Sequence, residues 1–159
     1  MIGSNSFLAL DSSDLSHSTR CCATSFSEEE KPEEMTLHDI EQGTVTVMAA
    51  EADVTVLQLE GEFDLANSGV IEDEAARALD ADRHLILDLS EATFIDSSVL
   101  RALVRVHNEA SGKCRVAVLQ LGAAAVVERV LDVSGLEDVM PRARTRLEAI
   151  NVIREAHLA

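Results

Sequence analysis

The hydrophobic pattern changes its period at residue 96, between a continuous apolar run and a stripe at helical spacing. The run consists of four residues, Leu85, Ile86, Leu87 and Leu89. It is too continuous for a half-exposed strand and predicts a buried one. The stripe consists of Val99, Leu100, Leu103, Val104 and His107. Its spacings of one, three and four predict a helix that starts near Ser97 and stops near Ser111 and Gly112.

The rest of the pattern predicts further strands and helices in alternation. The expected strands cover residues 45–47, 54–59, 116–121 and 139–143, and the expected helices cover 68–80, 124–133 and 146–157. The residues expected to face inward from the 124–133 helix are Val126, Val127, Val130 and Leu131. Gly135 fits a left-handed position after that helix.

Strands that alternate with helices imply a mostly parallel sheet with right-handed crossovers. The first two strands are close enough in sequence to pair antiparallel. The predicted fold is therefore a mixed α/β domain, with a mostly parallel sheet of four to five strands covered by about four helices.

The first 42 residues differ in composition from the rest of the chain. Eight of the first 27 residues are serines, and an acidic stretch, Glu28 to Glu34, follows them. Such a segment has too few apolar residues to offset the entropy cost of ordering. We expect a disordered tail over residues 1–42 and one domain over 43–159, since 159 residues suit a single domain.

The chain is strongly acidic, with a formal charge of −16 from 29 acidic and 13 basic residues. This balance argues against direct binding to nucleic acid or to an anionic membrane surface. The sequence has neither an apolar segment long enough to span a bilayer nor the basic start and apolar core of a signal peptide. We therefore expect a cytoplasmic protein without a membrane span.

Three polar residues, Asp96, Ser97 and Ser98, stand where the predicted strand gives way to the predicted helix. Their side-chain oxygens can accept hydrogen bonds from the first backbone N–H groups of the helix, which otherwise lack partners. Taken alone, the motif indicates a capped helix and nothing more. Its functional interpretation depends on the surrounding sequence.

Three stretches of the chain resemble the STAS domain family, specifically the single-domain bacterial antagonists of anti-sigma factors. They are residues 59–66, LEGEFDLA; residues 87–90 leading to 94–98, LDLS and FIDSS; and residues 127–139, VERVLDVSGLEDV. The stretches occur in the family's order and spacing. Together they cover roughly residues 43–157.

The resemblance implies that Ser97 is a phosphate acceptor and that Ser98 is the less favoured one. It further implies that the unmodified protein binds an anti-sigma factor with serine kinase activity and so releases a sigma factor. Phosphorylation of Ser97 would abolish binding, and a serine phosphatase would reset the protein. The implied role of Asp96 is to orient the Ser97 hydroxyl.

Three further residues are expected on the partner-binding surface, two from the resemblance and one from its position on the helix. Asp64 would line the surface, although it could equally be a turn residue that caps the next helix. Many relatives have glycine where this chain has Val99, which we expect to make the surface firmer and bulkier. Arg101 lies four residues beyond Ser97 on the same helix flank, where it could contact an acidic partner or simply be solvated.

An enzymatic function is not expected. The Gly-x-Ser-x-Gly motif of a hydrolase nucleophile is absent, and so is a glycine-rich phosphate loop. The carboxylates Asp64, Asp88 and Asp96 lie at strand ends rather than at a metal-binding spacing, so we expect neither a metal nor a cofactor. Two alternatives remain, a non-switching scaffold subunit of a lipid transporter or stress-sensing complex, and a nucleotide-binding domain.

Overall fold

The computed structural model describes residues 35–40 and 42–158, and in this part of the chain it forms a six-stranded mixed sheet. The strands are β1 (Thr36–Ile40), β2 (Gly43–Glu51), β3 (Val54–Phe63), β4 (His84–Ile95), β5 (Ala117–Gln120) and β6 (Arg142–Ala143). They follow one another across the sheet in chain order. The pairs β1–β2 and β2–β3 are antiparallel, and the remaining pairs are parallel.

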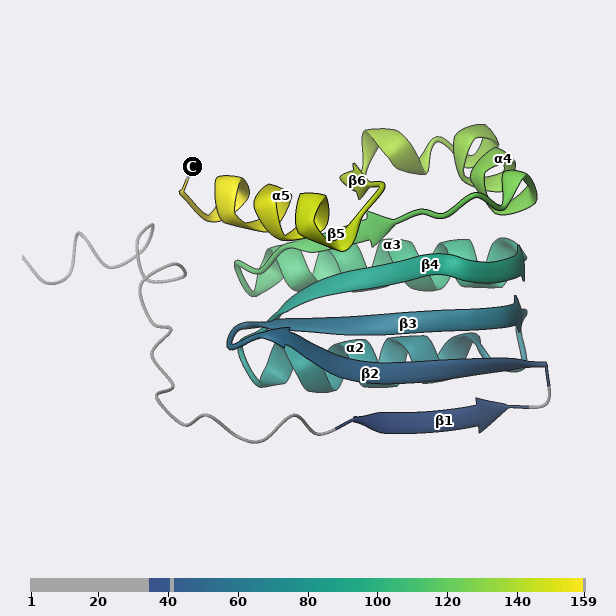
Figure 1. Ribbon diagram of the computed structural model, residues 1–159, viewed down its shortest axis with the longest axis horizontal. Helices are drawn as coiled ribbons and strands as arrows, with labels where there is room; N and C mark the ends of the chain where they lie inside the picture. Colours follow the sequence, from purple (N-terminus) through teal and green to yellow (C-terminus); the bar gives the residue numbers. More distant parts are fainter. Residues whose placement is uncertain (1–34, 41, 159) are drawn as a thin grey trace, which may run out of the picture.

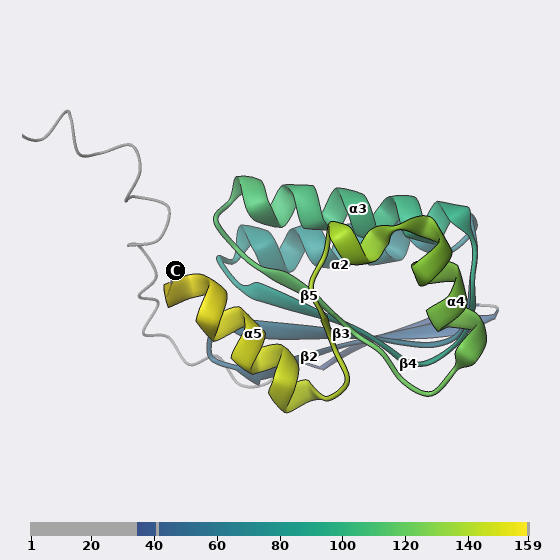
Figure 2. The same cartoon turned by 90° about the horizontal axis from the view of Figure 1, so that it is seen from above.

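The sheet is covered by helices on both faces. They are α2 (Ser68–Asp80), α3 (Ser97–Gly112), α4 (Ala125–Ser134), the short 3-10 helix η2 (Leu136–Asp138) and α5 (Arg146–Leu158). The buried side chains of α2, α3 and α4 belong to one core cluster, and those of α5 to another. Figures 1 and 2 show α2 and α3 side by side over one face of the sheet and α5 over the other.

The central strands show why the predicted apolar run is continuous. Leu85, Leu87 and Leu89 of β4 pack into the larger cluster, whereas Ile86 points to the smaller one. A strand between two covered faces needs apolar side chains on both. The predicted mixed α/β class is confirmed, with six strands instead of four to five.

The additional strand is β1, which lies within residues 1–42, the predicted disordered tail. Its five residues pair antiparallel with β2, and Ile40 packs against the larger core. Composition does not reveal this strand, because it is short, contains His38 and Asp39, and is held by backbone hydrogen bonds that any sequence can make. The rest of the predicted tail, residues 1–34, lies outside the described residues.

The helix α4 differs from its prediction at one position. Val127 and Leu131 are buried and Val130 is partly buried, but Val126 is 56% exposed. The interpretation of Val126 as inward-facing was therefore wrong. Gly135 has φ +72°, as predicted for the left-handed position after this helix.

None of the helices in the described residues combines the length and the apolar composition that a membrane crossing would require.

Candidate functional site

The predicted junction is a strand end followed at once by a helix. β4 ends at Ile95, Asp96 has an extended backbone, and α3 begins at Ser97. The Asp96 carboxylate caps the helix, because its Oδ1 accepts hydrogen bonds from the backbone N–H groups of Ser98 at 2.9 Å and Val99 at 3.2 Å. The motif therefore fixes where α3 starts.

The two serines differ in what their hydroxyl groups do. The Ser98 hydroxyl donates to Oδ1 of Asp96, and this side chain is half-buried. Ser97 is exposed, and its hydroxyl makes no hydrogen bond within the described residues. Asp96 thus orients Ser98 rather than Ser97, which differs from the role that the family resemblance implied for it. Only the Ser97 hydroxyl is left available to another molecule.

The charge state of Asp96 follows from these contacts. Burial is the largest single influence and raises the pKa of the carboxyl. Hydrogen bonds from the Ser98 hydroxyl and from the backbone N–H groups of Val99, Ser98 and Leu65 outweigh burial and hold the pKa below its ordinary value. The cap is therefore anionic at neutral pH, where it also interacts favourably with the positive end of the helix dipole.

Replacing the cap is expected to destabilise the domain. Asp96→Ala should lower the free energy of unfolding at pH 7 by about 1 kcal/mol, because two helix N–H groups and the Ser98 hydroxyl lose their acceptor. Since the folded-state pKa of Asp96 is depressed, its contribution is present above the unfolded pKa and is lost as pH falls through the folded one. Urea unfolding of both proteins, from pH 7 downward, should show the difference shrinking in acid.

Asn is the matched control for this substitution, because it caps helices about as well as Asp but does not titrate. Asp96→Asn should retain most of the stability of the wild type at pH 7. The difference in unfolding free energy between Asp96→Asn and Asp96→Ala should not change with pH. Equal stability of the wild type and Asp96→Ala at pH 7 would contradict a capping role.

The loop after β3 lies beside this helix start, since the Leu65 backbone bonds to Asp96. Asp64 Oδ1 accepts from the backbone N–H of Ala66 at 2.8 Å, and the side chain of buried Asn67 accepts from the Asp64 N–H at 2.7 Å. Asp64 is thus a turn residue that shapes this loop. Its side chain is half-buried, and its neighbour Leu65 connects the loop to Asp96.

Val99 does not lie on the surface. Its exposed fraction is 0%, and it belongs to the larger core cluster. The expectation that it would present a bulkier docking surface was wrong, because the third position of α3 turns toward the sheet. Arg101, by contrast, is exposed one turn beyond Ser97.

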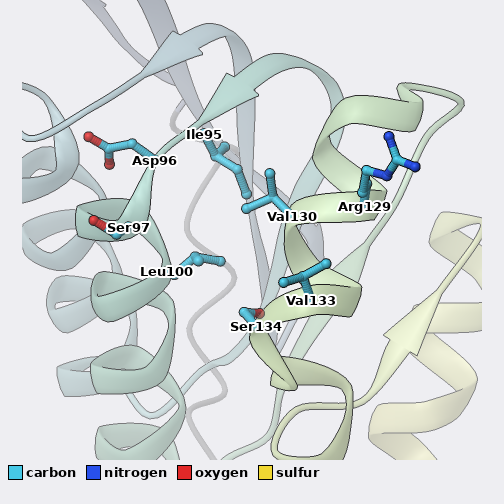
Figure 3. A pocket seen from close by; sticks show the side chains of 8 residues that line it. All are labelled: Ile95, Asp96, Ser97, Leu100, Arg129, Val130, Val133 and Ser134. Atoms are coloured by element: carbon cyan, nitrogen blue, oxygen red, sulfur yellow. The ribbon is translucent and has the colours of Figure 1, made fainter.

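A groove between α3 and α4 opens beside Ser97 (Figure 3). It has a volume of about 530 Å³. The side chains of Ile95, Leu100, Val130 and Val133 point toward one another across it, while Asp96 and Ser97 lie at the α3 edge and Arg129 at the α4 edge. An exposed hydroxyl beside an apolar groove suits contact with another protein.

Sequence reasoning missed the groove residues of α4 and two other apolar side chains. Val133 is 84% exposed and Leu65 is 76% exposed, and Phe94 at the end of β4 is also exposed. One signal could have found the first: α4 contains five large apolar residues in ten, more than one inward stripe needs. His, Cys, Asp and Glu side chains do not gather into groups that could hold a metal ion in the described part of the chain.

Comparison with solved structures supports the fold. A putative anti-sigma factor antagonist from Thermotoga maritima superposes with a TM-score of 0.61 at 23% identity, over 67% of this chain and 92% of that one. Unphosphorylated SpoIIAA, an anti-sigma factor antagonist of Bacillus, gives 0.60 at 23% identity, over 70% and 96%. An anti-sigma factor antagonist from Mycobacterium paratuberculosis gives 0.57 at 20% identity, over 79% and 97%.

Sequence comparison identifies the family. No curated protein matches the chain significantly. The family model of the STAS domain matches residues 46–149, which is more than half of the chain and includes every element from β3 to β6. The predicted resemblance is confirmed: the chain belongs to the STAS domain family.

Proposed function

We propose that this protein is an anti-sigma factor antagonist whose binding is switched off by phosphorylation of Ser97. In the unmodified state it binds an anti-sigma factor with serine kinase activity, which then releases its sigma factor. The kinase transfers the γ-phosphate of ATP to the Ser97 oxygen, the hydroxyl proton leaves, and ADP departs. A serine phosphatase hydrolyses the phosphate ester, and the cycle takes place in the cytoplasm.

One observation carries the proposal, namely that Ser97 is exposed and its hydroxyl bonds to no described residue, while its neighbour Ser98 is held by Asp96. Transfer to an oxygen requires that the kinase reach it and align it with the phosphate. Ser97 satisfies this requirement without a rearrangement of the domain. Ser98 would first have to break its bond to the cap.

The position of Ser97 also suits a switch that spares the fold. A phosphate adds about −1.5 to −2 charges at pH 7. At the first residue of α3, this charge meets the positive end of the helix dipole. The same charge stands at the edge of the apolar groove lined by Leu100, Val130 and Val133, where a docked protein would exclude water.

The phosphate is expected on Ser97 and not on Ser98. We would incubate the full chain with a candidate anti-sigma factor kinase and ATP and locate the modification by mass spectrometry. Ser97→Ala should abolish labelling, whereas the matched variant Ser98→Ala should be labelled at Ser97. A Ser97 that stays unlabelled by a kinase able to label another antagonist would contradict the proposal.

A further inference from the structure

Two cations stand out in the described part of the chain, Arg101 and Arg129. Every other Lys or Arg in residues 35–40 and 42–158 makes a hydrogen bond or an ion pair. Arg101 and Arg129 are exposed and make neither with any residue that the structure describes. Acidic residues outnumber basic ones by 29 to 13, so an unpaired arginine is unusual here.

The two arginines belong to α3 and α4, the helices that border the groove. Arg101 lies four residues after Ser97, one turn along α3. Arg129 is on α4 and lines the groove together with Ser97. By contrast, Arg105, the next arginine of α3, pairs with Glu72 of α2 at 3.3 Å. The two unpaired arginines of the described residues therefore belong to the two helices that border the groove, and Arg129 itself lines it.

The groove beside Arg129 has an apolar wall that extends beyond the core of the fold. Val126, Val130 and Val133 repeat at spacings of four and three along α4, and their stripe lies apart from the buried Val127 and Leu131. Val126 and Val133 are exposed and Val130 is partly buried. Val130 and Val133 face Leu100 and Ile95 across the groove, which makes the groove the complement of an apolar helix face.

We propose that the groove between α3 and α4 binds an acidic amphipathic helix of the anti-sigma factor. The apolar face of that helix fills the groove, and its carboxylates pair with Arg101 and Arg129. The inference rests on the proposed function and adds to it the chemistry of the docking segment. Local charge complementarity with the two unpaired arginines favours this occupant.

Charge reversal tests the two arginines. The purified kinase that labels Ser97 would be titrated with the unmodified full chain carrying Arg101→Glu or Arg129→Glu. Each substitution should weaken binding at least about tenfold and reduce the dependence of affinity on salt, because it replaces an attraction by a repulsion. Arg154→Glu is the control, since it makes the same charge change on α5, over the opposite face of the sheet.

A photo-crosslinker identifies the occupant. Placed at Val133, it should capture a segment of the anti-sigma factor that forms an amphipathic helix with Asp or Glu at its edges. Placed at exposed Leu147 of α5, it should capture none. Circular dichroism of every variant should match the wild type, so that misfolding is separated from lost binding.

The outcomes separate the two proposals. The groove inference is overturned if neither charge reversal changes the affinity, or if a basic segment is captured at Val133. The switch stands in both cases, provided that phosphorylation still abolishes the complex. A protein that binds no anti-sigma factor in either state overturns the proposed function. Loss of affinity in both arginine variants together with capture of an acidic helix supports both.

Discussion

Phosphorylation of Ser97 is expected to weaken the complex with the anti-sigma factor by at least about 100-fold. A phosphate at an exposed helix start would be buried by the docked partner, at the edge of the apolar groove lined by Leu100, Val130 and Val133. Burial of an unpaired charge costs several kcal/mol after relaxation. A penalty of about 3 kcal/mol already corresponds to a factor of about 100 in the dissociation constant. Calorimetric titration of the two forms measures the difference directly.

The substitutions Ser97→Ala and Ser97→Asp should separate charge from shape. Ser97→Ala should retain binding and lose the response to kinase and ATP. Ser97→Asp should weaken binding by less than phosphate does, because one carboxylate carries about half the charge and fewer acceptor oxygens. Ser98→Ala should keep both binding and the response. Equal affinity of the phosphorylated and bare proteins would show that Ser97 is not a switch.

The fold must persist for this comparison to be meaningful, and the position of Ser97 indicates that it does. The side chain is exposed and contributes no hydrogen bond within the described residues, so the phosphate breaks no contact. Thermal unfolding of the two forms should therefore agree to within a few degrees. A large loss of stability would mean that binding is lost through unfolding.

The elements around the site could be predicted because two independent signals agree there. α3 runs from Ser97 to Gly112, as predicted, since the apolar stripe sets its length and the Asp96 cap sets its start. α2 likewise runs from Ser68 to Asp80. Strand β1 lacks both signals, because five residues at a sheet edge bury only part of one face and their stability comes from backbone pairing.

The detailed contacts of the site could not be predicted for a different reason. Ser97 and Ser98 are chemically the same, and the choice between them depends on which hydroxyl faces the Asp96 carboxylate after the helix turns. A periodic pattern also does not say which of two apolar stripes faces inward. Val126 and Val127 of α4 have the same side chain, and only packing distinguishes them.

Val99 links the packing of the domain to the placement of the switch. Its replacement by glycine is expected to lower the free energy of unfolding by about 3 kcal/mol in total. Val99→Ala removes two buried methyl groups, at about 0.8 kcal/mol each plus a cavity term, or about 2 kcal/mol. Val99→Gly removes the last side-chain carbon and adds up to about 1 kcal/mol of helix propensity. Urea unfolding of both variants gives the two steps separately.

The control for Val99 is Val133, a valine that is 84% exposed on α4. Val133→Ala should change stability by less than about 0.5 kcal/mol, since it uncovers no buried surface. If Val99→Gly were as harmless as Val133→Ala, the side chain would not anchor α3. If the prediction holds, a glycine at this position weakens the anchor of the helix start that presents Ser97. Relatives with glycine at this position would then need other contacts to hold that helix start.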